Sequence, residues 1–262
     1  MKTILFIGDI VGKTGRISTR QIIPDLKKEF SPDLIIANGE NSAGGAGINE
    51  KKYRELIELG IDVITLGNHV WHNKEFIKEI SHCNRVVRPA NFPPGAPGLD
   101  RIVYKDIGVI NLLGRVFMKE MDCPFRSAGK IASELRNEVN IIIIDIHAEA
   151  TSEKYALGWY LDGKVSAVLG THTHVQTADE RILPNGTAYI TDIGMVGSLN
   201  SVIGVEKDTI VERFLTLMPK NFEVAKEWPV VFNAVVIAVD ENTGKAVDIK
   251  RINRIIESNA NG

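Results

Sequence analysis

The chain has 262 residues, a length that suits one large domain or two small ones. Hydrophobic residues make up 44 % and charged residues 24 %, and the formal charge is −2, so the composition is globular and lacks the basic excess of nucleic-acid-binding domains. No apolar run has the length of a membrane span or the pattern of a signal peptide, and Cys83 and Cys123 form no CxxC pair, so we expect a cytoplasmic protein with reduced thiols.

Strands and helices alternate in the first third of the chain. Short apolar runs predict buried strands, and apolar residues at helical spacing predict helices between them. The predicted strands are 3–9, 33–38 and 61–68, and the predicted helices are 15–30, 49–60 and 73–82. Asn49 suits the N-cap of the second helix, and Pro24 is expected to kink or shorten the first. This order predicts parallel strands joined by right-handed crossovers.

Hairpins enter the pattern in the rest of the chain. We expect hairpins or meanders at 101–114, 181–194 and 229–252, helices at 124–139, 152–163 and 207–218, and strands at 140–147 and 164–170. The dipeptide Asn185-Gly186 marks one hairpin turn. No repeat or linker interrupts the pattern, and only 257–262 is expected to fray. The sequence therefore predicts one α/β domain over 1–262, with two mixed sheets stacked face to face and helices outside.

Polar side chains follow five of the predicted strands. In open α/β sheets the carboxyl ends of strands form the ligand crevice. Each residue alone has an ordinary explanation, such as a helix cap or a satisfied core histidine, but five such strand ends in one chain predict a common site. The candidates are Asp9, Glu40, Asn41, Asn68, His69, His147, His172 and His174.

The stretch "LGTHTH" places His172 and His174 two residues apart. In an extended backbone residues i and i+2 face the same side, so we expect both imidazoles in one cluster, with Thr171 and Thr173 facing away. The donors are imidazole, carboxylate and amide groups without thiolate, which suits iron, manganese, zinc or magnesium. Seven candidate ligands exceed the needs of one tetrahedral ion, which favours two ions about 3.5–4 Å apart that share a carboxylate.

Five short motifs occur in order along the chain. They read "GDIVG", "GEN", "GNHVW", "DIHAEA" and "GTHTH". In this order they resemble the calcineurin-like metallophosphoesterases, and their finer wording resembles the bacterial YmdB-type subfamily, from Lys2 to about Ile252. The resemblance implies a four-layer αββα sandwich with a binuclear metal centre at the strand ends.

The resemblance also implies a role for each candidate. Asp9 and His174 would bind the first ion, Glu40 would bridge, and His69 would be the proton donor. The second ion would take Asn68, His147 and His172. Two departures from the wider family stand out: Val11 replaces the histidine of the first motif, and no acidic residue follows "GNH". The subfamily shares both changes, and Asn41 is expected to replace the missing first-site ligand.

The predicted function is a metal-dependent phosphoesterase that hydrolyses phosphodiesters, with 2′,3′-cyclic nucleotides as the expected substrates. A metal-bridging hydroxide would attack phosphorus, with His69 as general acid; iron or manganese is favoured over zinc or magnesium. The alternatives are a regulatory or RNA-metabolism-associated protein with a metal site and weak or no catalysis, and a metallopeptidase or deacetylase. A P-loop is disfavoured because "GDIVGKTG" is one residue short of the required spacing.

Several weaker signals keep two readings each. His72 either starts a surface helix or rims the site, and Asp145 and Asp192 either stabilise turns or hydrogen-bond a ligand histidine. The segment 114–126 reads equally well as a buried loop and as a lid or subunit contact, so a homo-oligomer is compatible with the sequence. The expected partner is a small phosphodiester or cyclic nucleotide, with no membrane and no strong nucleic-acid signal.

Overall fold

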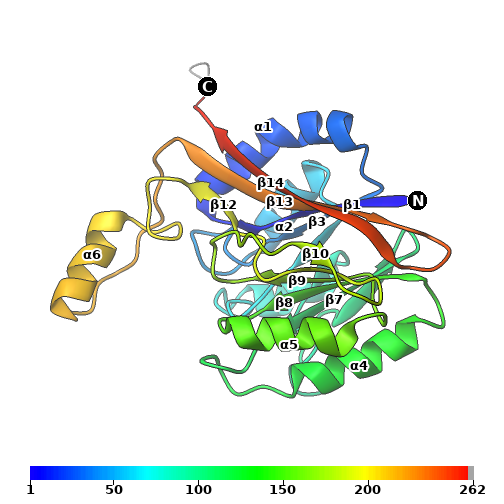
Figure 1. Ribbon diagram of the computed structural model, residues 1–262. Coiled ribbons are helices and arrows are strands. Elements are labelled where there is room, and N and C mark those ends of the chain that lie inside the picture. Colours follow the sequence, from blue (N-terminus) through cyan, green and yellow to red (C-terminus); the bar gives the residue numbers. More distant parts are fainter. Residues whose placement is uncertain (259–262) are drawn as a thin grey trace.

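The computed structural model describes residues 1–258, so the last part of the segment expected to fray lies outside the described residues. Two β-sheets stack face to face, and helices cover both outer faces (Figure 1). The first sheet contains β1 (Lys2–Ile7), β2 (Asp9–Ile10), β3 (Leu34–Asn38), β4 (Val63–Thr65), β5 (Val86–Val87), β12 (Met195–Ser198), β13 (Val230–Val239) and β14 (Ala246–Ile256). The second contains β6 (Arg101–Tyr104), β7 (Ile107–Leu113), β8 (Ile141–His147), β9 (Ala167–Thr171), β10 (Arg181–Ile182) and β11 (Ala188–Ile190).

Both sheets are mixed, as predicted. In the first sheet β1, β3, β4 and β5 run parallel in that order, while β13 is antiparallel to β1, β12 and β14. In the second sheet β7, β8, β9 and β11 are parallel, and the hairpin partners β6 and β10 form antiparallel edges. Parallel neighbours bring their carboxyl ends to one edge of each sheet, and this edge carries the candidate residues.

The helices are α1 (Gly12–Phe30), α2 (Glu50–Glu58), α3 (Phe76–Glu79), α4 (Pro124–Leu135), α5 (Thr151–Leu161) and α6 (Lys207–Thr216), with a 3₁₀ turn at Ile80–His82. Helix α1 runs through Pro24 without ending there, so the expected shortening is wrong. Asn49 caps α2 as predicted, because its side-chain oxygen accepts a hydrogen bond from the Lys52 amide. Among residues 1–258, no helix combines the length and the apolar character needed to cross a bilayer.

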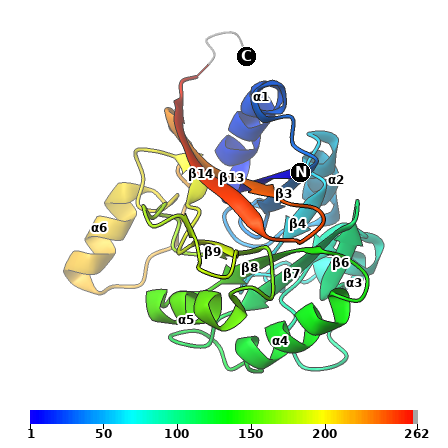
Figure 2. The same ribbon diagram turned by 45° about the vertical axis from the view of Figure 1, so that its right-hand side comes forward.

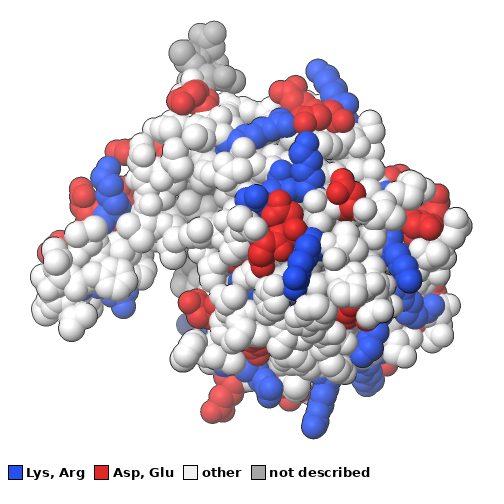
Figure 3. All heavy atoms as spheres, viewed as in Figure 1, with Lys and Arg blue, Asp and Glu red and all other residues white. Residues whose placement is uncertain are grey.

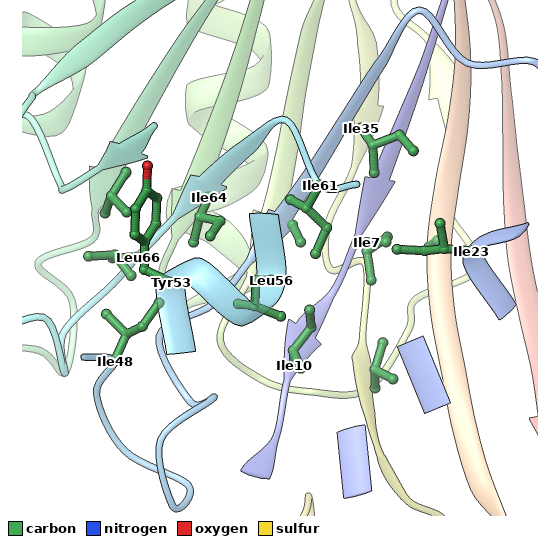
Figure 4. Close-up of a cluster of buried hydrophobic side chains, with 14 of the residues drawn as sticks. Ile7, Ile10, Ile23, Ile35, Ile48, Tyr53, Leu56, Ile61, Ile64 and Leu66 are labelled. Atoms are coloured by element: carbon green, nitrogen blue, oxygen red, sulfur yellow. The ribbon is translucent and has the colours of Figure 1, made fainter. Parts of the chain in front are cut away.

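Three hydrophobic clusters correspond to the three interfaces of a four-layer sandwich. One joins the first sheet to α1 and α2; Figure 4 shows Tyr53 of α2 near Ile64 of β4, and Ile23 of α1 beside Ile7 of β1. A second lies between the two sheets, and a third joins the second sheet to α4 and α5. The run "IIII" of β8 is buried on both faces, as expected for a strand between two apolar layers. The predicted αββα architecture is confirmed.

One segment leaves this compact body. Residues 199–229, which we call the arm, connect β12 to β13 and contain α6. Figures 1 and 2 show α6 standing away from the layers, in contrast to the other helices. Backbone hydrogen bonds from Glu206 to Glu223 and from Ala225 to Gly204 hold the two legs of the arm together at its base.

Candidate metal centre

The eight candidate residues lie together at the carboxyl edge of the two sheets, joined by a continuous series of contacts. Asp9 belongs to β2, His147 ends β8, and the others lie in the loops after β3, β4 and β9. Glu40 Oε1 lies 2.9 Å from His147 Nε2 and 3.2 Å from His69 Nδ1. Asn68 Oδ1 lies 3.1 Å from His147 Nε2. The His172 amide donates to Asp9 Oδ2, so the site joins residues that are more than 160 positions apart in the sequence.

Three of these residues form a tight donor cluster. One ligand atom from each of Glu40, His147 and His172 lies within 4.8 Å of the other two. The His172 Nδ1 atom is 3.0 Å from His147 Nε2, so the two rings meet through these nitrogens. Two nitrogens and a carboxylate oxygen at this spacing suit a divalent ion.

A second group lies on the other side of Asp9. The His174 Nε2 atom is 3.7 Å from Asp9 Oδ1 and 3.1 Å from Asn41 Nδ2. Asn41 Oδ1 lies 3.0 Å from His69 Nδ1, so the Asn41 amide sits between the two histidine rings. Val11, at the place of the family histidine, is buried and packs against Gly197 and Gly204, and so offers no donor.

Two carboxylate oxygens in the centre lack hydrogen-bond partners. Asp9 Oδ1 and Glu40 Oε1 are both buried, and neither accepts a hydrogen bond of good geometry. Imidazole nitrogens lie near both, at 2.9 Å from Glu40 Oε1 and 3.7 Å from Asp9 Oδ1, but a buried carboxylate oxygen without a hydrogen bond is unfavourable unless positive charge compensates it. The donor set and these two orphaned oxygens therefore fit bound metal ions.

The pKa values reflect the same crowding of charge. Burial lowers the pKa of His147, but the adjacent Glu40 outweighs burial and raises it to about 9. Burial raises the pKa of Glu40, yet the His147 ring holds it far below its usual range. Burial and the proximity of His147 lower the pKa of His172 to about 3, so its ring is neutral and available as a ligand. Burial raises the pKa of Asp9.

The loop that carries His172 and His174 is not extended, which corrects one prediction. Strand β9 ends at Thr171, and the two histidines have positive φ angles of 100° and 66°. Both rings reach the site through this folded loop and not through strand alternation. Thr171 does not face away either, because its Oγ1 lies 2.8 Å from His147 Nδ1.

Asp145 lies beneath His147 and acts on it through Thr171. The Thr171 hydroxyl donates to Asp145 Oδ1 at 2.7 Å, and Thr65 and Asn38 donate to Asp145 Oδ2. Burial raises the pKa of Asp145 to about 6. This network holds the His147 ring in place. The roles of Asn38, Thr65 and Thr171 in it were not predicted from the sequence, because their partners come from other strands.

Asp192 supports the histidine loop from its outer side. Its Oδ2 atom accepts hydrogen bonds from the Thr173 amide at 3.1 Å and the Thr173 hydroxyl at 2.8 Å. The same atom lies 2.7 Å from Nζ of Lys154, and both members of this ion pair are fully buried. Gly194 donates its amide to the other oxygen. Asp192 thus contacts Thr173, between the two histidines, and neither imidazole directly.

Two further features escaped the sequence interpretation. A Cβ atom at Gly67 would collide with the His147 ring and the Glu40 carboxylate, so glycine there allows the two side chains to meet. Glu149 Oε2 lies 3.1 Å from Nε2 of His172, the nitrogen that faces away from His147, and would fix the orientation of that ring.

His69 is partly exposed, with 37 % of its side chain accessible, which suits a group that meets substrate. Its amide donates to Glu40 Oε2 at 3.0 Å, and its ring lies edge-on to His72, with 6.0 Å between centroids. His72 therefore adjoins the site.

The segment 114–126 is held by Glu153, whose carboxylate accepts hydrogen bonds from the backbone amides of Arg115 and Val116.

Comparison with known proteins gives concordant matches. The model of a family described as YmdB-like protein matches residues 5–252. A 2′,3′-cyclic-nucleotide 2′-phosphodiesterase of Bacillus subtilis is 51 % identical over 95 % of this chain and 96 % of its own length. A putative phosphatase/phosphodiesterase of Mycoplasma pneumoniae is 37 % identical over 97 % of this chain and 92 % of its own. A crystal structure titled as a novel phosphatase from Mycoplasma pneumoniae superposes with a TM-score of 0.92 at 34 % identity, covering 98 % of this chain and 95 % of that one.

Proposed function

The chain belongs to the YmdB-like protein family and is a phosphoesterase, and from this premise we propose that it hydrolyses 2′,3′-cyclic nucleotides. The relative that is 51 % identical and named for this activity supports the substrate class. The observation that carries the proposal is the meeting of Asp9 and Glu40, each with an orphaned buried oxygen, with the imidazoles of His147, His172 and His174.

Two metal ions are proposed to occupy this centre. Asp9, Asn41 and His174 would hold the first, and Glu40 would bridge to the second. The second ion would take His147, His172 and Asn68, which lie together around Glu40. The donors are all nitrogen or oxygen, which favours iron or manganese over thiolate-seeking metals, with zinc or magnesium as alternatives. Bound ions would supply Lewis acidity to the phosphate and acidify a water molecule.

His69 is proposed as the general acid. A water oxygen would bond to phosphorus and lose its proton to solvent, the bond from phosphorus to the ribose 2′ oxygen would break, and His69 would give its proton to that departing oxygen. His69 would then be reprotonated from solvent. The product is then a nucleoside 3′-phosphate. Contacts from the His69 amide to Glu40 and from its ring to Asn41 would hold the imidazole in position. Proton donation of this kind is typically worth about 10²–10⁴ in rate.

The test is hydrolysis by the purified protein of a panel of phosphomonoesters, linear diesters and 2′,3′-cyclic nucleotides, with the product isomer identified by NMR. We expect turnover of the cyclic substrates to the 3′-phosphate, loss of turnover after chelation, and recovery with manganese or iron. His82→Ala, at an exposed histidine outside the site, is the matched control and should behave as the wild type.

Metal-loaded protein that hydrolyses none of these esters would favour the regulatory alternative. Full turnover by protein verified as metal-free would refute the metal-dependent reaction.

The cytoplasmic location that we expect from the sequence stays a prediction.

A further inference from the structure

The connection from β7 to α4, residues 114–123, starts beside the metal centre. Strand β7 runs parallel to β8, and Leu113 at its end pairs with His147. The next residue, Gly114, donates its amide to the His147 carbonyl at 3.0 Å. Figure 1 shows this connection at the end of the layers from which the arm also leaves. The segment therefore leaves the sheet at a candidate ligand of the second ion.

The first part of this connection is a fixed turn. The Met118 amide donates to the Arg115 carbonyl at 3.2 Å, and the Met118 side chain packs against the apolar cluster under α4 and α5. The Glu153 carboxylate holds the backbone amides of Arg115 and Val116. Met118 is nevertheless the least exposed of residues 115–120, since the other five are all exposed. Of the readings that the sequence left open for this segment, a buried loop is excluded.

Phe117 lies at the tip of the turn with its ring in solvent. Its side chain is 89 % exposed, the largest value among the exposed large apolar side chains of residues 1–258. Its φ is 61°, in the left-handed region that a bulky side chain rarely adopts. Strained conformations of this kind persist only where the surrounding structure enforces them, and they gather at ligand sites. An exposed aromatic ring held in strain beside a metal centre indicates a ligand that covers the ring.

The nucleobase of the proposed substrate has the chemistry and the position that this ring requires. In a 2′,3′-cyclic nucleotide the base lies one ribose away from the phosphorus atom that the metal centre would hold. Phe117 is three residues beyond Gly114, and three residues span at most about 10 Å, so the ring stays close to the strand end that carries His147. A base has flat faces that stack on aromatic side chains.

The charges in this region favour stacking over electrostatic selection. The formal charge of the chain is −2, and Figure 3 shows acidic and basic side chains interspersed over the layers. No extended basic field therefore orients an anionic nucleotide on this face. Residues 115–119 contain two basic residues and no acidic residue, so the turn itself does not repel such a ligand.

We propose that Phe117 is the stacking platform for the nucleobase, and that the site accepts cyclic nucleotides of any base. This inference rests on the proposed function, because it takes a nucleotide phosphate to lie at the metal centre. A phenyl ring offers no hydrogen-bonding group, and every base has a face that can stack, so the ring discriminates between bases only by the strength of stacking. Phe117 thus selects nucleotides over base-free esters.

Ligand binding by the manganese-loaded, full-length protein tests the platform without turnover. The probes are adenosine 3′-phosphate and methyl riboside 3-phosphate, in which a methoxy group replaces the base. Phe117→Gly should bind the nucleotide about 5–150-fold more weakly and the base-free compound equally well. Glycine adopts a positive φ without strain, so this variant keeps the turn and removes only the ring. Phe117→Trp should retain the affinity, whereas Phe117→Leu, which is apolar but not flat, should lose it.

The matched control is Trp159→Ala, which removes an aromatic side chain that is 49 % exposed near the end of α5. It should bind both probes as the wild type does. A wild type that binds the nucleotide no more tightly than the base-free compound overturns the platform, as does wild-type nucleotide affinity in Phe117→Gly. If that variant also sediments differently from the wild type, the ring belongs to a contact between copies.

Turnover of the four 2′,3′-cyclic nucleotides separates this inference from the proposed function. Binding that depends on Phe117 without hydrolysis of any of them would support the platform and refute the proposed reaction. Hydrolysis with the same kcat/KM in the wild type and Phe117→Gly would support the reaction and refute the platform. Values of kcat/KM that differ between bases by more than the roughly 150-fold that stacking can supply would refute the tolerance of any base.

Discussion

Replacing Lys154 by methionine should destabilise the protein and loosen the histidine loop. Methionine keeps most of the length of the stem that packs beside Gly170 but removes the charge 2.7 Å from Asp192. Asp192 would then be a buried carboxylate without its cation, supported only by hydrogen bonds from Thr173 and Gly194. Breaking a buried pair by removing one partner costs about 3–5 kcal/mol.

The loss is large enough to measure in two ways. For a chain of this size 1 kcal/mol corresponds to about 2–4 °C in Tm, so Lys154→Met should lower Tm by roughly 6–20 °C, and urea unfolding should give the free energy directly. Thr173 lies between His172 and His174, so metal affinity should also fall, by about 10–100-fold. Lys154→Met/Asp192→Asn should recover part of the stability, because it also removes the unpaired charge.

Lys130→Met is the control, since Lys130 is exposed on a neighbouring helix. It should change stability by less than about 0.5 kcal/mol. The reasoning fails if Lys154→Met costs less than about 1 kcal/mol, because the backbone donors alone would then compensate Asp192. It also fails in part if stability drops while metal affinity is unchanged, since the histidine loop would then not depend on this ion pair.

Three further predictions concern the metal centre. His69→Ala should lower kcat about 10²–10⁴-fold on cyclic nucleotides but less on nitrophenyl esters, whose leaving group needs little protonation; equal losses on both substrates would remove His69 from the acid role. Asn41→Ala should weaken the first ion and leave the site of Asn68, His147 and His172 occupied, as measured by metal analysis, and wild-type stoichiometry and affinity would refute a ligand role for Asn41. Glu40 raises the pKa of His147 from 6.5 to about 9. The free energy of unfolding that protonated His147 contributes to the metal-free protein is therefore complete below pH 6.5 and is lost as the pH rises through about 9. Urea unfolding of the metal-free protein should show this decline, which should be absent in His147→Gln.

The fold was predictable where the spacing of apolar residues along the chain matches the faces that the element buries in the layered structure. The apolar run of β8 and the helical spacing of α1 and α4 depend on burial alone, and both appear in the structure. Strands β5 and β12 were missed because each is short and is defined by its neighbours: β12 exists only through pairing with β2 and β13. The predicted helix 73–82 shortened to a single turn of α3 and a 3₁₀ turn.

The site was predictable in its residues but not in its support. Strand-end position was sufficient to gather all eight candidates, whereas their metal-binding and acid roles stay predictions. The folded loop of His172 and His174 was not foreseen, because positive φ angles at two histidines have no signature in the sequence. Lys154 and Gly67 were missed for a related reason: their importance comes from contacts across the fold with Asp192 and with the side chains of Glu40 and His147.

A hydrogen bond of 2.8 Å between His174 Nδ1 and the carbonyl oxygen of Ile203 connects the metal centre to the base of the arm. Ile203 itself has a positive φ of 47°, so its carbonyl is aimed by a conformation that the arm must maintain. We therefore expect the position of the His174 ring to be coupled to the conformation of the base of the arm. If a metal ion binds to His174, thermodynamic reciprocity requires that any factor by which metal binding favours one conformation of the arm is the same factor by which that conformation strengthens metal binding. A change in the arm, far from the metal centre in sequence, would then alter metal affinity.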